Sequence, residues 1–350
     1  MTGFFSIQGI YLKIVILCIF VFDKDNSLFI MEKPRVYFLG SGEIAVPVLK
    51  ALFNSEKLEL AGAGTQIDRP AGRKCRLVPT PVGAAAADLG IKIDKVPSVN
   101  APEYLEYLRR LDIDIVLVVS FGQLLKQPLL DLPRCACVNI HASLLPAYRG
   151  ASPIVSAMLA KEPVAGMTFM EMVLALDAGP VYTSVSRELD GSEFANTLEI
   201  ELGELAAAAT DDVLLDIYSG KLAAVPQDEE KATFCRKIRK ADGVIDWRSD
   251  ASDIDAKVRA YFPWPGAKCT VSSEKGDSVI TISKCRMRPE LAGLPGEFLS
   301  TDRKSIIVAC GSGGALEITE VIPAGGKNMP AAAFRNGTRG MPLAFPLPEC

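Results

Sequence analysis

Short apolar segments alternate with helix-like segments through the first two thirds of the chain. Four apolar segments predict β-strands, at residues 35–40, 58–65, 111–120 and 134–141, and the third is continuous enough to be buried on both faces of a parallel sheet. Further strands are predicted at 166–172 and 181–189. Helices are predicted over 44–52 and 193–219 and after Ser152-Pro153, where proline suits a first helical turn. This alternation predicts an α/β domain built on an open, Rossmann-like, mostly parallel sheet.

The pattern changes after a segment rich in acidic residues. Residues 222–233, "LAAVPQDEEKAT", predict a linker, and beyond it short alternating strands are separated by Gly, Ser and Asp turns. Such strands predict a small antiparallel β barrel similar to an oligonucleotide-binding (OB) fold. We therefore predict an α/β domain at 31–222, a linker at 223–237 and an OB-like domain at 238–345. A length of 350 residues also favours two domains.

Residues 1–30 fit neither domain. Their apolar run, "IVILCIFVF" at 14–22, is too short to span a bilayer, Lys13 alone precedes it, and no small-residue cleavage site follows. Met31 opens "MEKPRVYFLG", a short polar lead followed by the first predicted strand. We interpret residues 1–30 as an N-terminal extension that is disordered or comes from an over-extended reading frame, with a membrane anchor as the alternative.

Charge and composition restrict the function. The net charge of −4 excludes a uniformly basic protein that coats nucleic acid. Acidic side chains prevail at 31–230 and basic ones at 231–350, so a polyanionic partner is expected on the C-terminal part. Nine scattered cysteines without a Cys-x-x-Cys pair, together with one histidine, predict free thiols in the cytoplasm and no metal site.

That one histidine, His141, lies in "VNIHASLLPAYRGASPI" at 138–154, where a predicted strand ends. Ligands of open α/β sheets bind beyond the carboxyl ends of the strands. Asn139 lies two residues earlier, so both side chains point to the same face of the strand. An Asn amide is a fixed donor for an oxyanion, and an imidazole can transfer protons near neutral pH. The pair favours acyl-transfer chemistry, and the alternative is a structural histidine beside a turn.

A second motif predicts a different function. Residues 40–45, "GSGEIA", match the G-x-G-x-x-A turn of dinucleotide-binding folds, directly after the first predicted strand. Such folds place an acidic residue about 20 residues further on, where it binds the ribose. Here the second strand ends "AGAGT", and the first acid is Asp68 in the following loop. A nicotinamide-dependent oxidoreductase is therefore a less favoured hypothesis.

Several motifs resemble those of the formyltransferase family that uses 10-formyltetrahydrofolate. They are Asn139-x-His141, the Ser-Leu-Leu-Pro at 143–146, the Tyr-Arg-Gly-Ala at 148–151 and the Leu-Asp-Ala-Gly at 176–179. Segments 65–74, 226–247, 259–267 and 323–334 resemble the methionyl-tRNA formyltransferases, and the resemblance runs from Met31 nearly to the C-terminus. The chain departs from the family pattern at Gly42, where Pro is usual, and at Ala175, where Gly is usual.

The resemblance implies transfer of a formyl group from 10-formyltetrahydrofolate to the amino group of methionyl initiator tRNA. It also implies a cytoplasmic monomer with no metal and with no DNA or membrane partner. The catalytic residues that it implies are Asn139, His141 and Asp177. The folate wall that it implies is Ser143, Leu144, Leu145 and Pro146. Pro70 and Gly72 argue against a helix, so residues 68–76 predict a mobile surface loop. The resemblance implies that this loop contacts the tRNA acceptor stem, through Arg69, Arg73, Lys74 and Arg76.

The sequence leaves several alternatives open. Related enzymes with similar catalytic residues formylate amino-sugar nucleotides, and a non-catalytic tRNA-binding protein is a further alternative. His141 or Asp177 could take the proton of the amine. Tyr148 and Arg149 are either folate contacts or packing residues. Residues 118–125, "VVSFGQLL", are expected to line the pterin pocket beside the same crevice.

Overall fold

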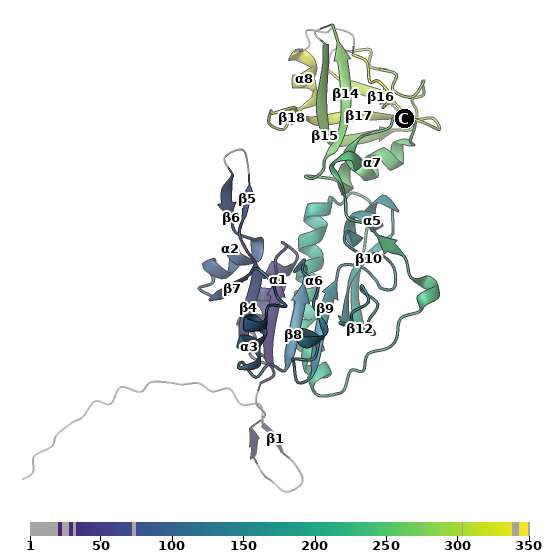
Figure 1. Ribbon diagram of the computed structural model, residues 1–350. Coiled ribbons are helices and arrows are strands. Elements are labelled where there is room, and N and C mark those ends of the chain that lie inside the picture. Colours follow the sequence, from purple (N-terminus) through teal and green to yellow (C-terminus); the bar gives the residue numbers. More distant parts are fainter. Residues whose placement is uncertain are drawn as a thin grey trace, which may run out of the picture.

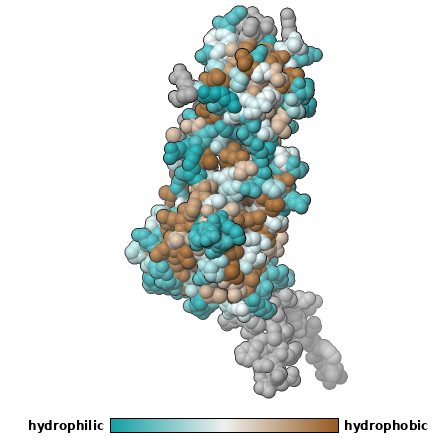
Figure 2. All heavy atoms as spheres, turned by 90° about the vertical axis from the view of Figure 1, so that its right-hand side faces the viewer, coloured by the Kyte–Doolittle hydropathy of each residue, from teal (hydrophilic) through white to brown (hydrophobic). Residues whose placement is uncertain are grey.

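The computed structural model describes residues 20–22, 28–30, 33–71, 75–274, 276–302, 304–337 and 343–348. Figure 1 shows an elongated molecule with an α/β domain below and a β-rich domain above. The connection between them runs up the right-hand side of the α/β domain in that view. Figure 2 faces this side and shows polar side chains at the waist and apolar patches over the α/β domain.

A seven-stranded sheet, in the order β12-β11-β9-β8-β3-β4-β7, forms the centre of the α/β domain. Its strands are β3 (Arg35–Gly40), β4 (Glu59–Gln66), β7 (Ile93–Val96), β8 (Ile115–Val119), β9 (Ala136–His141), β11 (Val164–Glu171) and β12 (Val181–Glu188). Five neighbouring strands from β9 to β7 are parallel, whereas β11 runs antiparallel to both β9 and β12. The predicted open, mostly parallel sheet is confirmed.

Helices cover both faces of this sheet. They are α1 (Ala45–Asn54), α2 (Pro81–Asp88), α3 (Pro102–Arg109), α4 (Gln127–Leu130), α5 (Pro153–Leu159) and α6 (Ala195–Tyr218). Proline stands in the first turn of α2 to α5, where its missing N–H leaves no hydrogen bond unmade. One core packs α1 and α6 against the sheet, and a second packs α3 against the other face.

The third predicted strand is shorter than expected. Residues 111–120 were predicted as one strand, but β8 covers Ile115–Val119. Asp112 and Ser120 adopt left-handed backbone conformations, with φ of 48° and 46°, so the chain turns on both sides of the strand. All five residues of β8 are buried, as expected for the middle of a parallel sheet.

The C-terminal domain is an antiparallel β structure, as predicted. Its sheet has the order β14-β15-β17-β16, and β18 pairs with β17. The elements are α7 (Ala251–Ala260), β14 (Ala267–Ser273), β15 (Gly276–Arg288), β16 (Ile306–Ala309), β17 (Ala315–Pro323), β18 (Met329–Pro330) and α8 (Ala331–Gly337). Short bridges extend its two edges, Ser272 to Ala344 and Val308 to Phe298. Phe298 stacks on Phe345 with ring centroids 6.3 Å apart, so the two edges meet around the core.

The segment predicted as a mobile loop at 68–76 forms a hairpin instead. β5 (Arg69–Ala71) pairs antiparallel with β6 (Arg76–Val78), so that Pro70 lies opposite Leu77. A two-stranded hairpin tolerates proline because one edge of each strand needs no ladder bond. Arg73 and Lys74 lie outside the described residues. In Figure 1 the hairpin projects from the α/β domain toward the upper domain.

The connection between the domains is more ordered than a plain linker. It contains the short helical turn η1 (Glu229–Lys231) and β13 (Phe234–Cys235), which pairs in parallel with β10 (Arg149–Gly150). A second turn, η2 (Lys240–Gly243), leads into the C-terminal domain.

Most of residues 1–30, which were interpreted as an N-terminal extension, lie outside the described residues. Within that range the structure describes β1 (Phe20–Phe22) and β2 (Leu28–Ile30), which form an antiparallel pair. Among the helices of the described part, none is both long and apolar enough to cross a membrane.

Candidate active site

A cleft of about 840 Å³ opens at the carboxyl ends of β3, β8 and β9. Asn139 and His141 line it from the end of β9, and Asp177 lines it from the loop after β11. Residues 120–125 after β8 also line it, as expected for the "VVSFGQLL" segment. The structure therefore brings the three predicted catalytic residues into one cleft at the edge where parallel sheets bind ligands.

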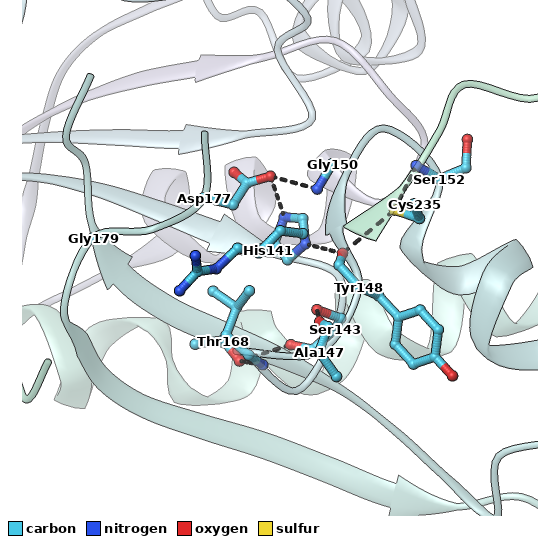
Figure 3. A network of polar contacts seen from close by, with 12 residues as sticks. His141, Ser143, Ala147, Tyr148, Gly150, Ser152, Thr168, Asp177, Gly179 and Cys235 are labelled. Carbon is cyan, nitrogen blue, oxygen red and sulfur yellow. Dashed lines mark hydrogen bonds and ion pairs between the residues drawn. The ribbon is translucent and has the colours of Figure 1, made fainter. Parts of the chain in front are cut away.

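His141 is buried, and both ring nitrogens face oxygen atoms. Nε2 donates to the carbonyl oxygen of Tyr148 at 3.0 Å, and Nδ1 lies 3.7 Å from Oδ2 of Asp177 (Figure 3). The same carboxylate oxygen of Asp177 also accepts a hydrogen bond from the Gly150 amide at 2.8 Å, so the carboxylate is held beside the imidazole.

Asp177 is held in a tight turn. Its φ is +49°, a left-handed conformation that residues other than glycine adopt rarely. Two residues later the chain passes so close to β11 that a Cβ on Gly179 would lie 1.8 Å from the carbonyl oxygen of Glu171. Glycine is therefore required in the Asp-Ala-Gly motif because the backbone approaches β11, and this approach presents the Asp177 carboxylate to His141.

Asn139 is half-buried, and its side chain makes no hydrogen bond to any residue that the structure describes. Its backbone pairs with β8 on one side and with β11 on the other, so the rigid sheet fixes its position. An amide that is fixed and unpaired inside a cleft is free to donate to a bound group.

The turn that was predicted to form the folate wall, Ser143, Leu144, Leu145 and Pro146, is not part of the lining of this cleft. Ser143 Oγ donates to the carbonyl of Ala147 at 2.6 Å, and Thr168 Oγ1 donates to the carbonyl of Ser143 at 2.7 Å. The turn is folded onto itself and onto β11, and it supports the segment that carries Tyr148.

Tyr148 and Arg149 are packing residues in this structure. The Tyr148 hydroxyl donates to Glu162, and burial together with this bond raises its pKa to about 12. The Arg149 side chain is 2% exposed and pairs with Glu229 at 2.7 Å. This structure therefore favours the packing interpretation over the folate-contact interpretation for both residues.

Glu199 is a residue of the cleft that the sequence did not predict. This residue of α6 lines the cleft, and burial raises the pKa of its carboxyl, which accepts a hydrogen bond from the Ile44 amide. It lies near the start of a long helix that contains several other acidic residues, so no local motif marks it.

The four basic residues that were predicted to contact the tRNA do not all lie in the described part of the structure. Arg69 lines the edge of the cleft and donates to Gln66, whereas Arg76 is exposed on β6. Arg73 and Lys74, between them in sequence, are not among the described residues.

The turn expected of a dinucleotide site packs against the loop that follows β8. A Cβ on Gly42 would lie 2.5 Å from Oγ of Ser120, so the glycine permits a close approach of two loops. Asp68, the first acid after β4, forms an ion pair with Lys95. Neither observation favours the oxidoreductase hypothesis. Within the described residues, no cluster of three His, Cys, Asp or Glu side chains could hold a metal ion.

Comparisons with known proteins agree with this geometry. Residues 34–214 match the family model described as formyl transferase, and residues 237–339 match that of the formyl transferase C-terminal domain. The chain is 37% identical over 289 residues to a methionyl-tRNA formyltransferase of Akkermansia muciniphila, which covers 82% of this chain and 91% of that relative. A methionyl-tRNA formyltransferase of Geobacter sulfurreducens is also 37% identical, over 87% of this chain and 94% of the relative.

Solved structures share the fold at lower identity. HypX from Aquifex aeolicus in complex with tetrahydrofolic acid has a TM-score of 0.60 at 17% identity, over 88% of this chain and 48% of that chain. WlaRD, a sugar 3N-formyl transferase, has a TM-score of 0.59 at 17% identity, over 82% of this chain and 97% of that chain. On the family models and these relatives, the chain belongs to the formyl transferase family, among the methionyl-tRNA formyltransferases.

Proposed function

We propose that this enzyme transfers the formyl group of 10-formyltetrahydrofolate to the amino group of methionyl initiator tRNA, as a monomer in the cytoplasm. The observation that carries the chemistry is the convergence of Asn139, His141 and Asp177 in one cleft at the end of β9. The acceptor follows from relatives named methionyl-tRNA formyltransferase that match across both domains.

The protein must stabilise an oxyanion, accept a proton from the amine and donate a proton to the leaving nitrogen. The amine of the methionyl group attacks the formyl carbon, a tetrahedral oxyanion forms, and the folate nitrogen leaves with a proton. The unpaired Asn139 amide can donate to the oxyanion, and one such donor contributes roughly 2.7–4 kcal/mol in acyl transfer. The His141–Asp177 pair can accept the proton that the amine loses and return one to the leaving nitrogen.

The cleft fits a reduced folate. Its volume of about 840 Å³ lies in the range of sites for ligands of this size, roughly 300–1,000 Å³. Phe121, Leu125 and Met170 give it apolar walls, on which we propose that the pterin ring packs. Since Ser143–Pro146 lie outside this lining, we assign that turn an indirect part in folate binding, through its support of the loop at Tyr148.

We propose that the tRNA approaches the cleft from the side on which the hairpin projects toward the upper domain (Figure 1). We propose that Arg69 and Arg76, with Arg73 and Lys74, contact the acceptor stem. Arg suits this role because its guanidinium can donate two hydrogen bonds to one phosphate group or stack on an unpaired base. The basic side chains of the C-terminal domain, residues 238–345, would then hold the tRNA body through phosphate contacts, which weaken as salt rises.

A comparison of acceptors tests the proposal. With labelled 10-formyltetrahydrofolate as the donor, formyl transfer is measured to methionyl initiator tRNA and to a dTDP-linked amino sugar. We expect kcat/KM for the charged tRNA to exceed that for the sugar nucleotide by several orders of magnitude. Equal or faster formylation of the sugar nucleotide would assign the enzyme to the sugar formyltransferases instead.

A further inference from the structure

The segment between the domains, residues 225–235, packs against the two loops that hold His141; we call it the docked linker. β13 pairs with β10, and the Gly150 backbone lies so near that a Cβ there would be 2.2 Å from the carbonyl oxygen of Cys235. Thr233 accepts hydrogen bonds from the Tyr148 amide at 2.8 Å and from the Arg149 amide at 2.8 Å. Through these contacts, the docked linker packs onto the catalytic domain as one of its own segments.

Gln227 of the docked linker uses its whole side-chain amide. Its Oε1 accepts from Nε and Nη2 of Arg149, at 3.1 and 2.8 Å. Its Nε2 donates to the carbonyl oxygens of Asp177 and Gly179, at 2.9 and 2.7 Å. Two donated and two accepted bonds are all that a primary amide can make. Gln227 thus joins the loop containing Arg149 to the loop containing Asp177.

These two loops supply both partners of His141. The carbonyl of Tyr148, next to Arg149, accepts from Nε2, and the Asp177 carboxylate faces Nδ1. The separation of the loops therefore sets where the imidazole lies and how it is oriented. Arg149, bound by both Gln227 and the Glu229 carboxylate, cannot shift without breaking charge-assisted bonds.

The backbone of Asp177 needs such support. A φ of +49° is unfavourable for an aspartate, and such conformations persist when surrounding contacts hold them. The two bonds from Gln227 end on the carbonyls of Asp177 and Gly179, at the two ends of the Asp-Ala-Gly turn. The Gly150 amide, by contrast, binds the side chain of Asp177.

We propose that Gln227 is a positioning residue for catalysis: from the docked linker, it fixes the Asp177 turn and the Tyr148 loop at the spacing that holds the His141 imidazole between them. This inference rests on the proposed formyl transfer for its kinetic consequence, but its structural consequence can be observed without any reaction. The segment that leads to the C-terminal domain thereby completes the active site.

Two variants separate the bonds of Gln227. Gln227→Glu keeps oxygens for Arg149 but turns a carboxylate oxygen, instead of N–H donors, toward the two carbonyls. Gln227→Ala removes all four bonds. Glu230→Ala is the matched control, because Glu230 is an exposed residue of the same linker whose side chain makes no hydrogen bond or ion pair with a described residue.

The kinetic test separates positioning from binding. We expect kcat to fall about 10- to 100-fold in both Gln227 variants, because small misplacements of catalytic groups cost up to about 10²-fold. KM for folate and for tRNA should stay within about twofold of the wild type, since Gln227 lies outside the lining of the cleft. Unchanged kcat, or a loss confined to KM, would overturn the proposal.

The second measurement uses the fact that His141 is the one histidine of the chain. In tag-free, full-length protein labelled with ring-¹⁵N histidine, long-range ¹H–¹⁵N spectra report on this imidazole alone. We expect the Nδ1 and Nε2 signals to shift or broaden in both Gln227 variants and to stay at wild-type positions in Glu230→Ala. His141 signals that superimpose on the wild type in a folded Gln227→Glu protein would overturn the proposal, even if no formyl acceptor were known.

Discussion

Replacement of Asn139 by alanine separates catalysis from folding. The side chain is half-buried but makes no hydrogen bond to a described residue, so its removal leaves none of the described polar groups without a partner. We therefore expect the free energy of unfolding to change by about 1 kcal/mol or less. In a domain of about 200 residues, that change moves Tm by roughly 2–4 °C.

The expected effect on the rate is much larger. Loss of one oxyanion donor costs roughly 2.7–4 kcal/mol of transition-state stabilisation, or about 10²–10³ in kcat. The substrate binds in its ground state without the oxyanion, so KM should change little. Single-turnover formylation at saturating folate and tRNA measures the chemical step directly, and thermal unfolding of the same samples measures stability.

Asn54→Ala provides the matched control. Asn54 is exposed at the end of α1 and donates to the carbonyl of Lys50 at 2.9 Å, so its loss removes a hydrogen bond far from the cleft. This variant should keep the wild-type rate. A folded Asn139→Ala protein that formylates within a few-fold of the wild type would remove Asn139 from the oxyanion role.

Three further predictions concern the N-terminus, the hairpin and acid stability. A chain that begins at residue 31 should keep its Tm and its formylation rate, because the catalytic sheet begins at β3; a loss of either would show that residues 1–30 belong to the folded domain. Arg73→Ala should raise KM for charged tRNA by about 10- to 100-fold while folate affinity is unchanged, since a charged hydrogen bond contributes roughly 1.5–3 kcal/mol. Arg110→Ala, just after the end of α3, should have no effect. The Arg236 guanidinium lowers the pKa of Asp242 to about 2, so this pair stabilises the fold above the ordinary carboxyl pKa of about 4, and its contribution is lost as pH falls from there to about 2. Asp242→Asn should therefore flatten the pH dependence of Tm in that interval, and an unaltered pH profile would contradict this assignment.

The sequence predicted the sheet and the location of the cleft because both depend on local patterns. Continuous apolar runs define β3, β8 and β9, and a strand has a two-residue repeat that places Asn139 and His141 on one face. The same rule could not place Ser143–Pro146, because β9 ends at His141 and the chain then turns back on itself. Beyond the end of a strand, side-chain direction depends on tertiary contacts.

Contacts between distant segments were not predictable in the same way. Gln227 lies 50 residues from Asp177 and 78 from Arg149 along the chain, and a side-chain amide that joins two loops leaves no periodic signal. The segment was interpreted as a plain linker because Pro226 and three acids resemble one. The hairpin at 69–78 was missed for a similar reason, since Pro70 and Gly72 favour irregular structure until the two arms pair.

The most direct test of the central claim is the single-turnover rate of formyl transfer to methionyl initiator tRNA, measured for the wild type and for His141→Ala. The wild type should form formylmethionyl-tRNA, and the variant should do so roughly 10²–10⁴ times more slowly, because general acid–base catalysis by the single histidine is lost. Both proteins should bind folate with similar affinity. Equal rates in two folded proteins would contradict the assignment of the chemistry to the cleft at His141.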